Sequence, residues 1–470
     1  MPLPILSVAQ VRDWEERTWN AGIAVESVIE QAGQAVARLA AQLTQSGDFI
    51  LLLAGKGKNG CDTRIAAAHL SDREVLVLDI TNPAEDIAVL HQHLQEDPVL
   101  VVDGLFGIGL NRDLEEHWQK FIQCINESDA PVLSVDCPSG LDADNGLIRG
   151  TAIEAAITLC LGGLKSGLLV NSAAQYVGRL RIASHIGLND PAPEADSYWV
   201  AEQDMRGLRP QRDPASHKGN HGHVGIIGGS TGYHGAPVLA GRASLRAQPG
   251  LVSIFTPVYQ QVSAQCQSVM VHPWGRGCVD ALSRASALVV GPGLAGDDIE
   301  DSLRQTVLDL WGQSGKPMVI DASALDWVPK KSPETSAFRL LTPHSGEAAR
   351  LLDCSVDKVE SDRLRAARTL AELFGVTVLL KGRHTILTQA TGPALVNSTG
   401  NVGLAQGGSG DVLAGFIGGL LAQPVFRNRE IQAVTYAAWK HGWAADQLTA
   451  AGDYWGMDDL LNALGKREFH

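Results

Sequence analysis

A glycine-rich turn that runs directly into an apolar helical stretch is the clearest sign of chemistry in this sequence. The segment NVGLAQGGSGDVLAGFIGGLLAQ spans residues 401–423, and its GGSGD turn ends at Asp411. Backbone N–H groups at a helix start are unpaired and the helix dipole favours negative charge there, so residues 408–410 could cradle a phosphate. The Asp411 carboxylate could accept a proton from a substrate hydroxyl group beside those donors. Taken alone, the segment is equally compatible with an ordinary glycine-rich turn.

Three polar loops in the first half of the chain each follow an apolar run. Their sequences are GKGKNGCD (55–62), DGLFGIGLNRD (103–113) and SVDCPSGLDADNG (134–146). Loops that follow parallel strands meet at one edge of the sheet, where ligands bind. Glycines allow close backbone approach to phosphates, while Asp103, Asp136 and Ser139 supply oxygen ligands and an acid or base. The three loops together therefore predict a ligand site.

Short apolar runs alternating with helix-period segments predict the elements that position these loops. In the first half the runs are 49–55, 74–80, 99–107, 131–140, 156–165 and 178–188, after helical spacing over residues 7–43. In the second half they are 223–229, 251–257, 287–293, 317–325, 339–347 and 376–382. Buried strands of this kind between helices are typical of mostly parallel α/β sheets.

A polar, proline-containing segment divides the two series. Residues 203–218 read QDMRGLRPQRDPASHK, and the length of 470 residues favours two domains. We expect a first domain over 1–205, a linker over 206–216 and a second domain over 217–470. The fold class is therefore α/β, with two tandem domains.

Charge and cysteine usage restrict the class of protein. The net charge is −14, and no run of Lys or Arg stands out, which argues against nucleic acid or an anionic membrane as a partner. The 7 cysteines are scattered without a CxxC pair, which is typical of a reducing compartment. No apolar stretch is long enough to span a bilayer, so we expect a cytoplasmic protein.

Four further motifs accompany the turn at 407–411. They are GGSTGYHGAPVLAGRASLR (228–246), GPGLAGDD (291–298), TPHSGEAARLL (342–352) and KGRHT (381–385). In this order they resemble the ribokinase-like superfamily and, within it, the NAD(P)H-hydrate dehydratase family, from about His217 to the C-terminus. The resemblance implies a ribokinase-like αβα domain. It also implies phosphoryl transfer to the hydroxyl group of a hydrated nicotinamide, after which phosphate leaves and the reduced nicotinamide is restored.

The same resemblance implies the residues of the second site. The hydrated substrate would be lined by Ala236, Gly293, His344 and Asp411, with Asp411 as the base. The nucleotide would be held by Lys381, Gly382, Arg383, His384, Thr385 and Gly410. The phosphoryl donor, used with Mg²⁺, would be ADP in bacterial members and ATP in eukaryotic ones.

The first-half loops, with LGGLKSGLL (161–169), resemble the NAD(P)H-hydrate epimerase domain over about residues 1–205. The resemblance implies a Rossmann-like αβα sandwich that interconverts the R and S hydrates of NADH and NADPH. Asn59, Asp103 and Ser139 would coordinate a potassium ion, and Asp136 would be the catalytic acid or base and contact substrate. The other substrate contacts would be Lys58, Asn59, Gly60, Cys61, Asp62, Gly107, Ile108, Gly109, Leu110, Asn111, Arg112 and Asp113.

One loop departs from the family pattern. Where the family has N-N-G-G-D-G, residues 58–63 read Lys-Asn-Gly-Cys-Asp-Thr. Cys61 and Thr63 would be costly if either had a positive φ, and Lys58 places an ammonium group beside the cation site. Three interpretations stay open: Lys58 binds pyrophosphate directly, the loop tolerates the changes, or the epimerase is weak or lost. We hypothesise a retained but impaired epimerase.

Two other functions remain as alternatives to a fused repair enzyme. The second half could be a small-molecule kinase acting on a sugar, or on a hydroxymethyl-pyrimidine or thiazole alcohol. The first half could be an inactive binding or oligomerisation module. We expect a homo-oligomer, in which the amphipathic helices in 7–43 could form an interface. His217, His221 and His223 form a cluster that favours a solvated loop over a metal site.

Overall fold

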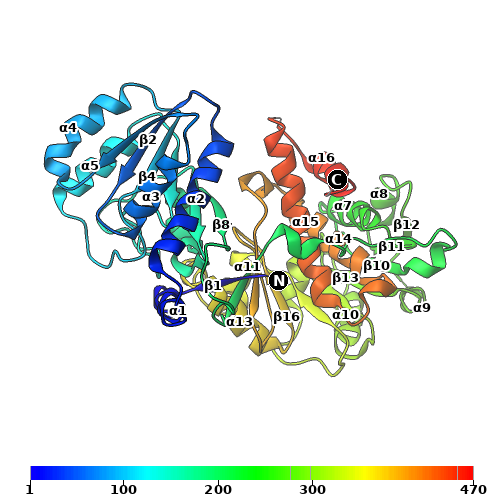
Figure 1. Ribbon diagram of the computed structural model, residues 1–470. Helices are drawn as coiled ribbons and strands as arrows, with labels where there is room; N and C mark the ends of the chain where they lie inside the picture. Colours follow the sequence, from blue (N-terminus) through cyan, green and yellow to red (C-terminus); the bar gives the residue numbers. More distant parts are fainter. Residues whose placement is uncertain (1, 276, 297, 453, 469–470) are drawn as a thin grey trace. The chain divides into compact units, whose positions relative to one another are not determined.

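The chain folds into two compact units, each built around a mainly parallel β-sheet (Figure 1). The computed structural model describes residues 2–275, 277–296, 298–452 and 454–468. One unit comprises Leu3–Asp196, and the other comprises Ser197–His470 with the extreme N-terminus. The prediction of two tandem α/β domains is confirmed. The division lies earlier than the expected boundary after residue 205, because strand β9 (Ser197–Val200) pairs with β18 (Ala394–Asn397).

The N-terminal unit contains a parallel sheet of order β3-β2-β4-β5-β6-β8. The elements of this unit are β1 (Leu3–Leu6), α1 (Val8–Asn20), α2 (Val25–Leu43), β2 (Phe49–Ala54), α3 (Lys58–Ala68), β3 (Glu74–Asp79), α4 (Pro83–Leu94), β4 (Leu100–Gly104), α5 (Glu116–Asn126), β5 (Val132–Val135), β6 (Ile157–Leu161), β7 (Leu164–Lys165), α6 (Ala174–Val177) and β8 (Arg179–Ala183), with short 3₁₀ turns over 166–173. The chain leaves β2 toward β3 on one side and returns to β4 on the other. This reversal creates a crevice at the carboxyl ends of β2 and β4, where ligands bind in such sheets.

Helices cover both faces of this sheet, because its central strands are apolar on both sides. Ile50 and Leu52 of β2 belong to a core shared with α2 and α3. Leu51 and Leu53 belong to a second core shared with α4 and α5. Figure 1 shows β2 and β4 between these two helix pairs. Such burial on both faces explains why the strands are continuous apolar runs rather than alternating ones.

The C-terminal unit has the sheet order β12-β11-β10-β13-β14-β15-β16-β17-β18-β9. Pairing is parallel from β12 to β16, antiparallel for β16–β17–β18, and parallel again for β18–β9. The remaining elements are β10 (His223–Ile227), α7 (Gly235–Arg246), β11 (Leu251–Thr256), α8 (Tyr259–Ser263), β12 (Met270–Pro273), α9 (Cys278–Leu282), β13 (Ala287–Val290), α10 (Asp301–Gln313), β14 (Met318–Ile320), β15 (Arg339–Leu341), α11 (Ser345–Leu351), α12 (Val356–Ser361), α13 (Arg363–Phe374), β16 (Thr377–Leu380), β17 (Ile386–Thr388), α14 (Ser409–Leu421), α15 (Glu430–Ala450) and α16 (Met457–Leu464).

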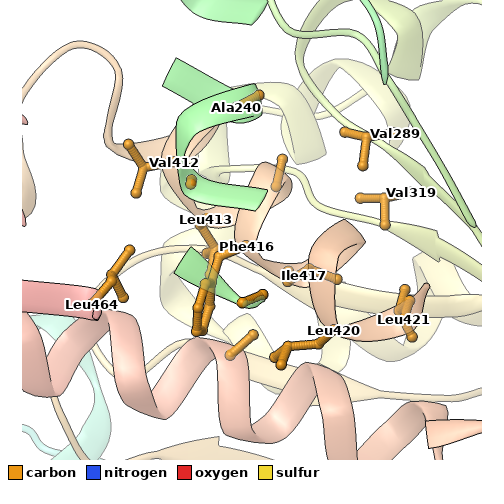
Figure 2. Close-up of a cluster of buried hydrophobic side chains, with 14 of the residues drawn as sticks. Ala240, Val289, Val319, Val412, Leu413, Phe416, Ile417, Leu420, Leu421 and Leu464 are labelled. Atoms are coloured by element: carbon orange, nitrogen blue, oxygen red, sulfur yellow. The ribbon is translucent and has the colours of Figure 1, made fainter. Parts of the chain in front are cut away.

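Helix α14 is the centre of the C-terminal core. Figure 2 shows its side chains Val412, Phe416 and Ile417 in one buried apolar cluster that also contains Ala240 of α7 and Val289 of β13. Its glycines allow close helix packing, since a β-carbon at Gly415 would lie 2.1 Å from the carbonyl oxygen of Ala240. The helix is therefore held rigidly, and its N-terminal GGSGD turn is fixed with it.

The twelve apolar runs named above all contain strands, which confirms the sequence prediction for β2 to β6, β8, β10, β11 and β13 to β16. The run 156–165 forms two strands, because Gly162 at φ +73° turns the chain between β6 and β7. Strand β7 pairs with β1, a strand that the sequence did not reveal. Within the described part of the chain, no helix is both long and apolar enough to cross a membrane.

Candidate functional site

A cavity of 630 Å³ opens at the carboxyl ends of β2 and β4 in the N-terminal unit. Its walls combine apolar side chains with the polar loops singled out from the sequence. The predicted residues that line it are Lys58, Asn59, Asp62, Gly107, Ile108, Gly109, Leu110, Asn111, Arg112, Asp113 and Asp136. Gly60 and Cys61 are not among its lining residues. Most of the residues that the sequence analysis assigned to substrate binding in this unit therefore line one cavity.

Asp136 reaches this cavity from a strained position after β5. Its backbone has φ 66°, an uncommon conformation for a residue with a side chain. One carboxylate oxygen accepts a hydrogen bond from the backbone N–H of Leu161 at 2.9 Å and an ion-paired one from Lys165. Lys165 is fully buried and also donates to the Leu161 carbonyl at 2.9 Å. A buried ammonium group therefore holds the Asp136 carboxylate in place.

A second carboxylate, Asp62 on α3, lines the same cavity. Only 5% of Asp62 is exposed, and no hydrogen bond from a described residue reaches its side chain. Burial, reinforced by the charge of Asp136, raises the pKa of Asp62 to about 8. The cavity thus contains one carboxylate paired with an ammonium group and one that favours the protonated form.

Asp103 lies near the end of β4 and is completely buried, so it does not line the cavity itself. It accepts hydrogen bonds from Ser139 Oγ (2.6 Å), Ser139 N (2.9 Å) and Ser134 Oγ (2.9 Å). Burial raises the pKa of Asp103 despite these bonds. Asn59 adjoins this group: its amide nitrogen donates to the carbonyls of Phe106 (2.9 Å) and Val135 (2.7 Å). Asn59, Asp103 and Ser139 therefore belong to one oxygen-rich neighbourhood, linked through Phe106.

The altered segment 58–63 is the first part of helix α3, not an irregular loop. Cys61 and Thr63 have helical backbones, and neither is among the positive-φ residues, so the strain considered from the sequence does not arise. Thr63 Oγ1 donates a hydrogen bond to the Asn59 carbonyl at 2.8 Å. The same Oγ1 lies beside Gly104, where a β-carbon would be 1.9 Å from it. Lys58 is bound to Glu15 at 2.9 Å, so its charge is compensated.

In the C-terminal unit, Asp411 lies in the first turn of α14 beside three other ionisable groups. The turn enters the helix at Gly408 with φ 97°. Burial, helped by the charges of Asp321 and Glu347, raises the pKa of Asp411 to about 7. Lys381 Nζ lies 2.7 Å from Asp321 Oδ1 and 3.8 Å from Glu347 Oε2. Burial opposes protonation of Lys381, but these carboxylates prevail and raise its pKa.

The remaining predicted substrate residues form two groups in this unit. His344 caps α11 by accepting hydrogen bonds at Nδ1 from Gly346 N and Glu347 N, and its backbone bridges to Lys381. A β-carbon at Gly410 would lie 3.3 Å from Lys381 Nζ, so this glycine is adjacent to the same group. Ala236 instead adjoins Gly293, where a β-carbon would lie 3.1 Å from that of Ala236.

The predicted nucleotide residues 381–385 form the tight connection from β16 to β17. Gly382 (φ 147°) packs against the Arg363 guanidinium group, and Thr385 Oγ1 donates to its carbonyl at 3.1 Å. The His384 ring packs edge-on against Trp199 at 5.0 Å, and burial lowers its pKa to about 3. Arg383 Nη1 is buried without a hydrogen-bond partner among the described residues. His384 is therefore neutral and faces the protein, whereas Arg383 has an unused donor.

Sequence reasoning missed Lys165 and Asp321 as site residues. Each had a signal: Lys165 is a charge at the end of the apolar run 156–165, and Asp321 is a charge inside the run 317–325, directly after β14. In the histidine cluster, His221 Nε2 is hydrogen-bonded to Ser216 Oγ (2.7 Å) and His223 Nε2 to Ser253 Oγ (2.9 Å). Ser409 N–H donates to the Gln406 carbonyl at 3.3 Å, so this amide of the proposed phosphate cradle is already engaged.

Comparisons with known proteins find matches to both units of the chain. A family model described as NAD(P)H-hydrate dehydratase matches residues 224–464, and one described as YjeF-related protein N-terminus matches 25–88 and 80–167. The bifunctional NAD(P)H-hydrate repair enzyme of Escherichia coli K12 is 34% identical over 94% of this chain and 89% of its own length. This chain belongs to the bifunctional NAD(P)H-hydrate repair enzyme family. The Vibrio cholerae member is 33% identical over 99% of this chain and 98% of its own length.

A solved structure supports the assignment of the C-terminal unit to the repair-enzyme family. The ADP/ATP-dependent NAD(P)H-hydrate dehydratase of Bacillus subtilis, co-crystallised with ATP and Mg²⁺, is 30% identical with a TM-score of 0.50. The match covers 56% of this chain and 95% of the Bacillus chain. This similarity confirms the ribokinase-like fold that the sequence motifs imply for the C-terminal unit.

Proposed function

We propose that this chain repairs hydrated NADH and NADPH with two separate sites. The N-terminal unit interconverts the R and S hydrates, and the C-terminal unit dehydrates the S form at the expense of a nucleotide. The observation that carries the proposal is that each unit holds a site lysine against a buried carboxylate, Lys165 against Asp136 and Lys381 against Asp321. Full-length similarity to bifunctional relatives supports the assignment of these sites to the two reactions.

In the C-terminal unit, Asp411 accepts the proton of the substrate hydroxyl group as that oxygen attacks a phosphoryl group. A pKa of about 7 suits this step, because the carboxylate is substantially ionised at neutral pH and still basic enough to hold the proton. Lys381, fixed by Asp321 and Glu347, stabilises the charge that develops on the transferred phosphoryl oxygens. Phosphate is then the leaving group, which hydroxide is not.

The nucleotide, ADP in this proposal, lies along residues 381–385 with its phosphates at the start of α14. Arg383 supplies the unused buried donor, and the backbone of His384 rather than its ring faces the ligand. Among the described residues, no group of three or more His, Cys, Asp or Glu side chains is arranged to hold a metal ion. Mg²⁺ would therefore be bound chiefly by phosphate oxygens and water, and it would neutralise phosphate charge.

In the N-terminal unit, Asp136 is the catalytic acid or base, and the loop 107–113 holds the dinucleotide pyrophosphate. Asp103, Asn59 and Ser139 fit a potassium ion, because Asp103 is a fully buried carboxylate without an ion pair to any described residue. Such a charge is costly unless it is compensated, and hard oxygen ligands suit an alkali cation. The ion would supply a positive charge that anchors phosphate and substrate. Since Cys61 and Thr63 are unstrained in α3, we expect an epimerase of full rather than impaired activity.

Recovery of reduced-nicotinamide absorbance from a mixture of R and S hydrates tests both assignments. The full chain is incubated with Mg²⁺, K⁺ and either ADP or ATP. Rapid return of nearly all the absorbance is expected with ADP. Return of the S fraction followed by a slow spontaneous phase would refute the epimerase assignment. No return with either nucleotide would refute the dehydratase, and a stable phosphorylated product would favour the small-molecule kinase.

The proposal extends to location and assembly. We expect a cytoplasmic protein, because the cysteines of the described chain are all free, as in a reducing compartment. We also expect a homo-oligomer, which size-exclusion chromatography with light scattering would reveal. Removal of residues 1–205 would distinguish an assembly module from an epimerase. If the truncated chain no longer associates but R-to-S conversion is unchanged, the assembly module is favoured; if the conversion is lost, the epimerase is favoured.

A further inference from the structure

Two carboxylates with different surroundings face the cavity of the N-terminal unit. Asp136 is ion-paired with the fully buried Lys165, whereas Asp62 has neither an ion pair nor a hydrogen bond from any described residue. Both line the same 630 Å³ cavity, whose walls include Leu161, Ile186 and Leu188. A buried carboxyl group that no protein atom satisfies is costly, and it points to a ligand atom as its partner.

We propose that Asp62 is a second catalytic residue of this unit, which acts as the proton donor while Asp136 acts as the proton acceptor. The inference rests on the proposed epimerase function and deepens it by dividing the chemistry between two groups. Lys165 is a positioning residue, because it acts on Asp136 rather than on substrate. Pairs of titratable groups whose environments differ in this way are typical of acid–base enzymes.

The reaction that this pair supports balances without an added reagent. The substrate hydroxyl group lies on the ring carbon next to the ring nitrogen. Asp62 protonates that oxygen, the C–O bond breaks with its electron pair leaving on water, and the nitrogen lone pair forms a C=N⁺ bond. Water then adds to the opposite face while Asp136 takes its proton. In the R-to-S direction the product is the S hydrate, and one proton has passed from Asp62 to Asp136. Proton exchange with solvent restores both groups, and the S-to-R direction uses the same two groups with their roles exchanged.

The charges around Asp62 agree with its role as the donor. Asp136 and Glu15 oppose its ionisation, and Lys58 and Lys165 favour it. Burial outweighs the two lysines and, with these carboxylates, raises the pKa of Asp62 to about 8, so it is protonated at neutral pH. Lys58 is bound to Glu15 and is half exposed, which weakens its effect on Asp62.

The test uses the full chain with saturating K⁺ and no nucleotide, so that the C-terminal unit is idle. Pure R hydrate is incubated, and S hydrate is measured by chromatography. Asp62→Asn is expected to lower kcat about 10²- to 10⁴-fold with little change in KM, the range for loss of a general acid or base. Asp62→Glu is expected to restore part of the rate. Asp72→Asn, an exposed carboxylate before β3 bonded to Arg73, is the matched control and should match wild type.

Two further readouts separate catalysis from a structural role. The wild-type rate should fall as pH rises through about 8, and Lys165→Met should lower kcat because Asp136 loses the ammonium group that positions it. In ¹⁸O-labelled water, each epimerisation should place one labelled oxygen in the product. A wild-type chain without R–S conversion would overturn the proposed function itself. If the wild-type chain converts the hydrates normally, two results would overturn this inference alone. One is an Asp62→Asn variant that keeps more than a tenth of the wild-type kcat, and the other is wild-type conversion without uptake of the label.

Discussion

Replacing Asp411 by Asn should stabilise the C-terminal unit in a pH-dependent way while it abolishes dehydration. Burial raises the pKa of this carboxyl from 3.8 to about 7. Between these values the folded chain retains a proton that the unfolded chain has lost, so stability falls as pH rises, and the penalty is complete above about pH 7. The difference between 3.8 and about 7 corresponds to about 4 kcal/mol. An amide in this position carries no such penalty.

The stabilisation expected for Asp411→Asn depends on pH. At about pH 8 the expected gain is up to about 4 kcal/mol, and at about pH 5 it is about 1.5 kcal/mol, because Asp411 is then already protonated in the folded chain. For a unit of this size the difference corresponds to roughly 5–10 °C in Tm. Thermal unfolding of the full chain measures it, with the C-terminal transition identified by its shift with ADP. Exposed Asp309→Asn should change neither value. Equal stabilisation of Asp411→Asn at both pH values would refute the assignment.

Three other changes test the two sites. Lys381→Met should reduce the dehydration rate by about 100-fold or more, measured by absorbance recovery, because it removes the ammonium group beside the transferred phosphoryl group. Gly60→Ala should destabilise the N-terminal unit by about 1–3 kcal/mol, because the new β-carbon would lie 1.9 Å from the Gly55 carbonyl oxygen. Gly57→Ala is the control in the same thermal unfolding assay and should be tolerated, because its β-carbon meets nothing within 4 Å. Replacing K⁺ by tetramethylammonium should lower epimerisation and the Tm of the N-terminal unit, and Asp103→Asn should remove both effects.

The strands and the glycine-rich helix start were predictable because each is encoded locally. Apolar runs mark β2 and β4, and GGSGD marks the start of α14. The pairing of strand β9 with β18 was not predictable, because the two strands lie almost two hundred residues apart in the chain. The helical conformation of residues 58–63 was also missed, since a segment with Gly, Lys and Asn resembles a loop. The Lys165–Asp136 pair depends on tertiary packing of β7 beside the end of β5, which no local pattern encodes.

The two sites have opposite protonation requirements, which define a pH range for complete repair. Dehydration needs Asp411 ionised and should rise with pH through about 7, whereas epimerisation needs Asp62 protonated and should fall through about 8. Starting from pure R hydrate, ADP, Mg²⁺ and K⁺, the full chain should therefore regenerate reduced nicotinamide fastest between about pH 7 and 8. Below this range S hydrate should accumulate, because dehydration is limiting; above it R hydrate should persist, because epimerisation is limiting. The opposite pattern, with R hydrate persisting at low pH and S hydrate accumulating at high pH, would show that the acid and base roles have been assigned to the wrong carboxylates.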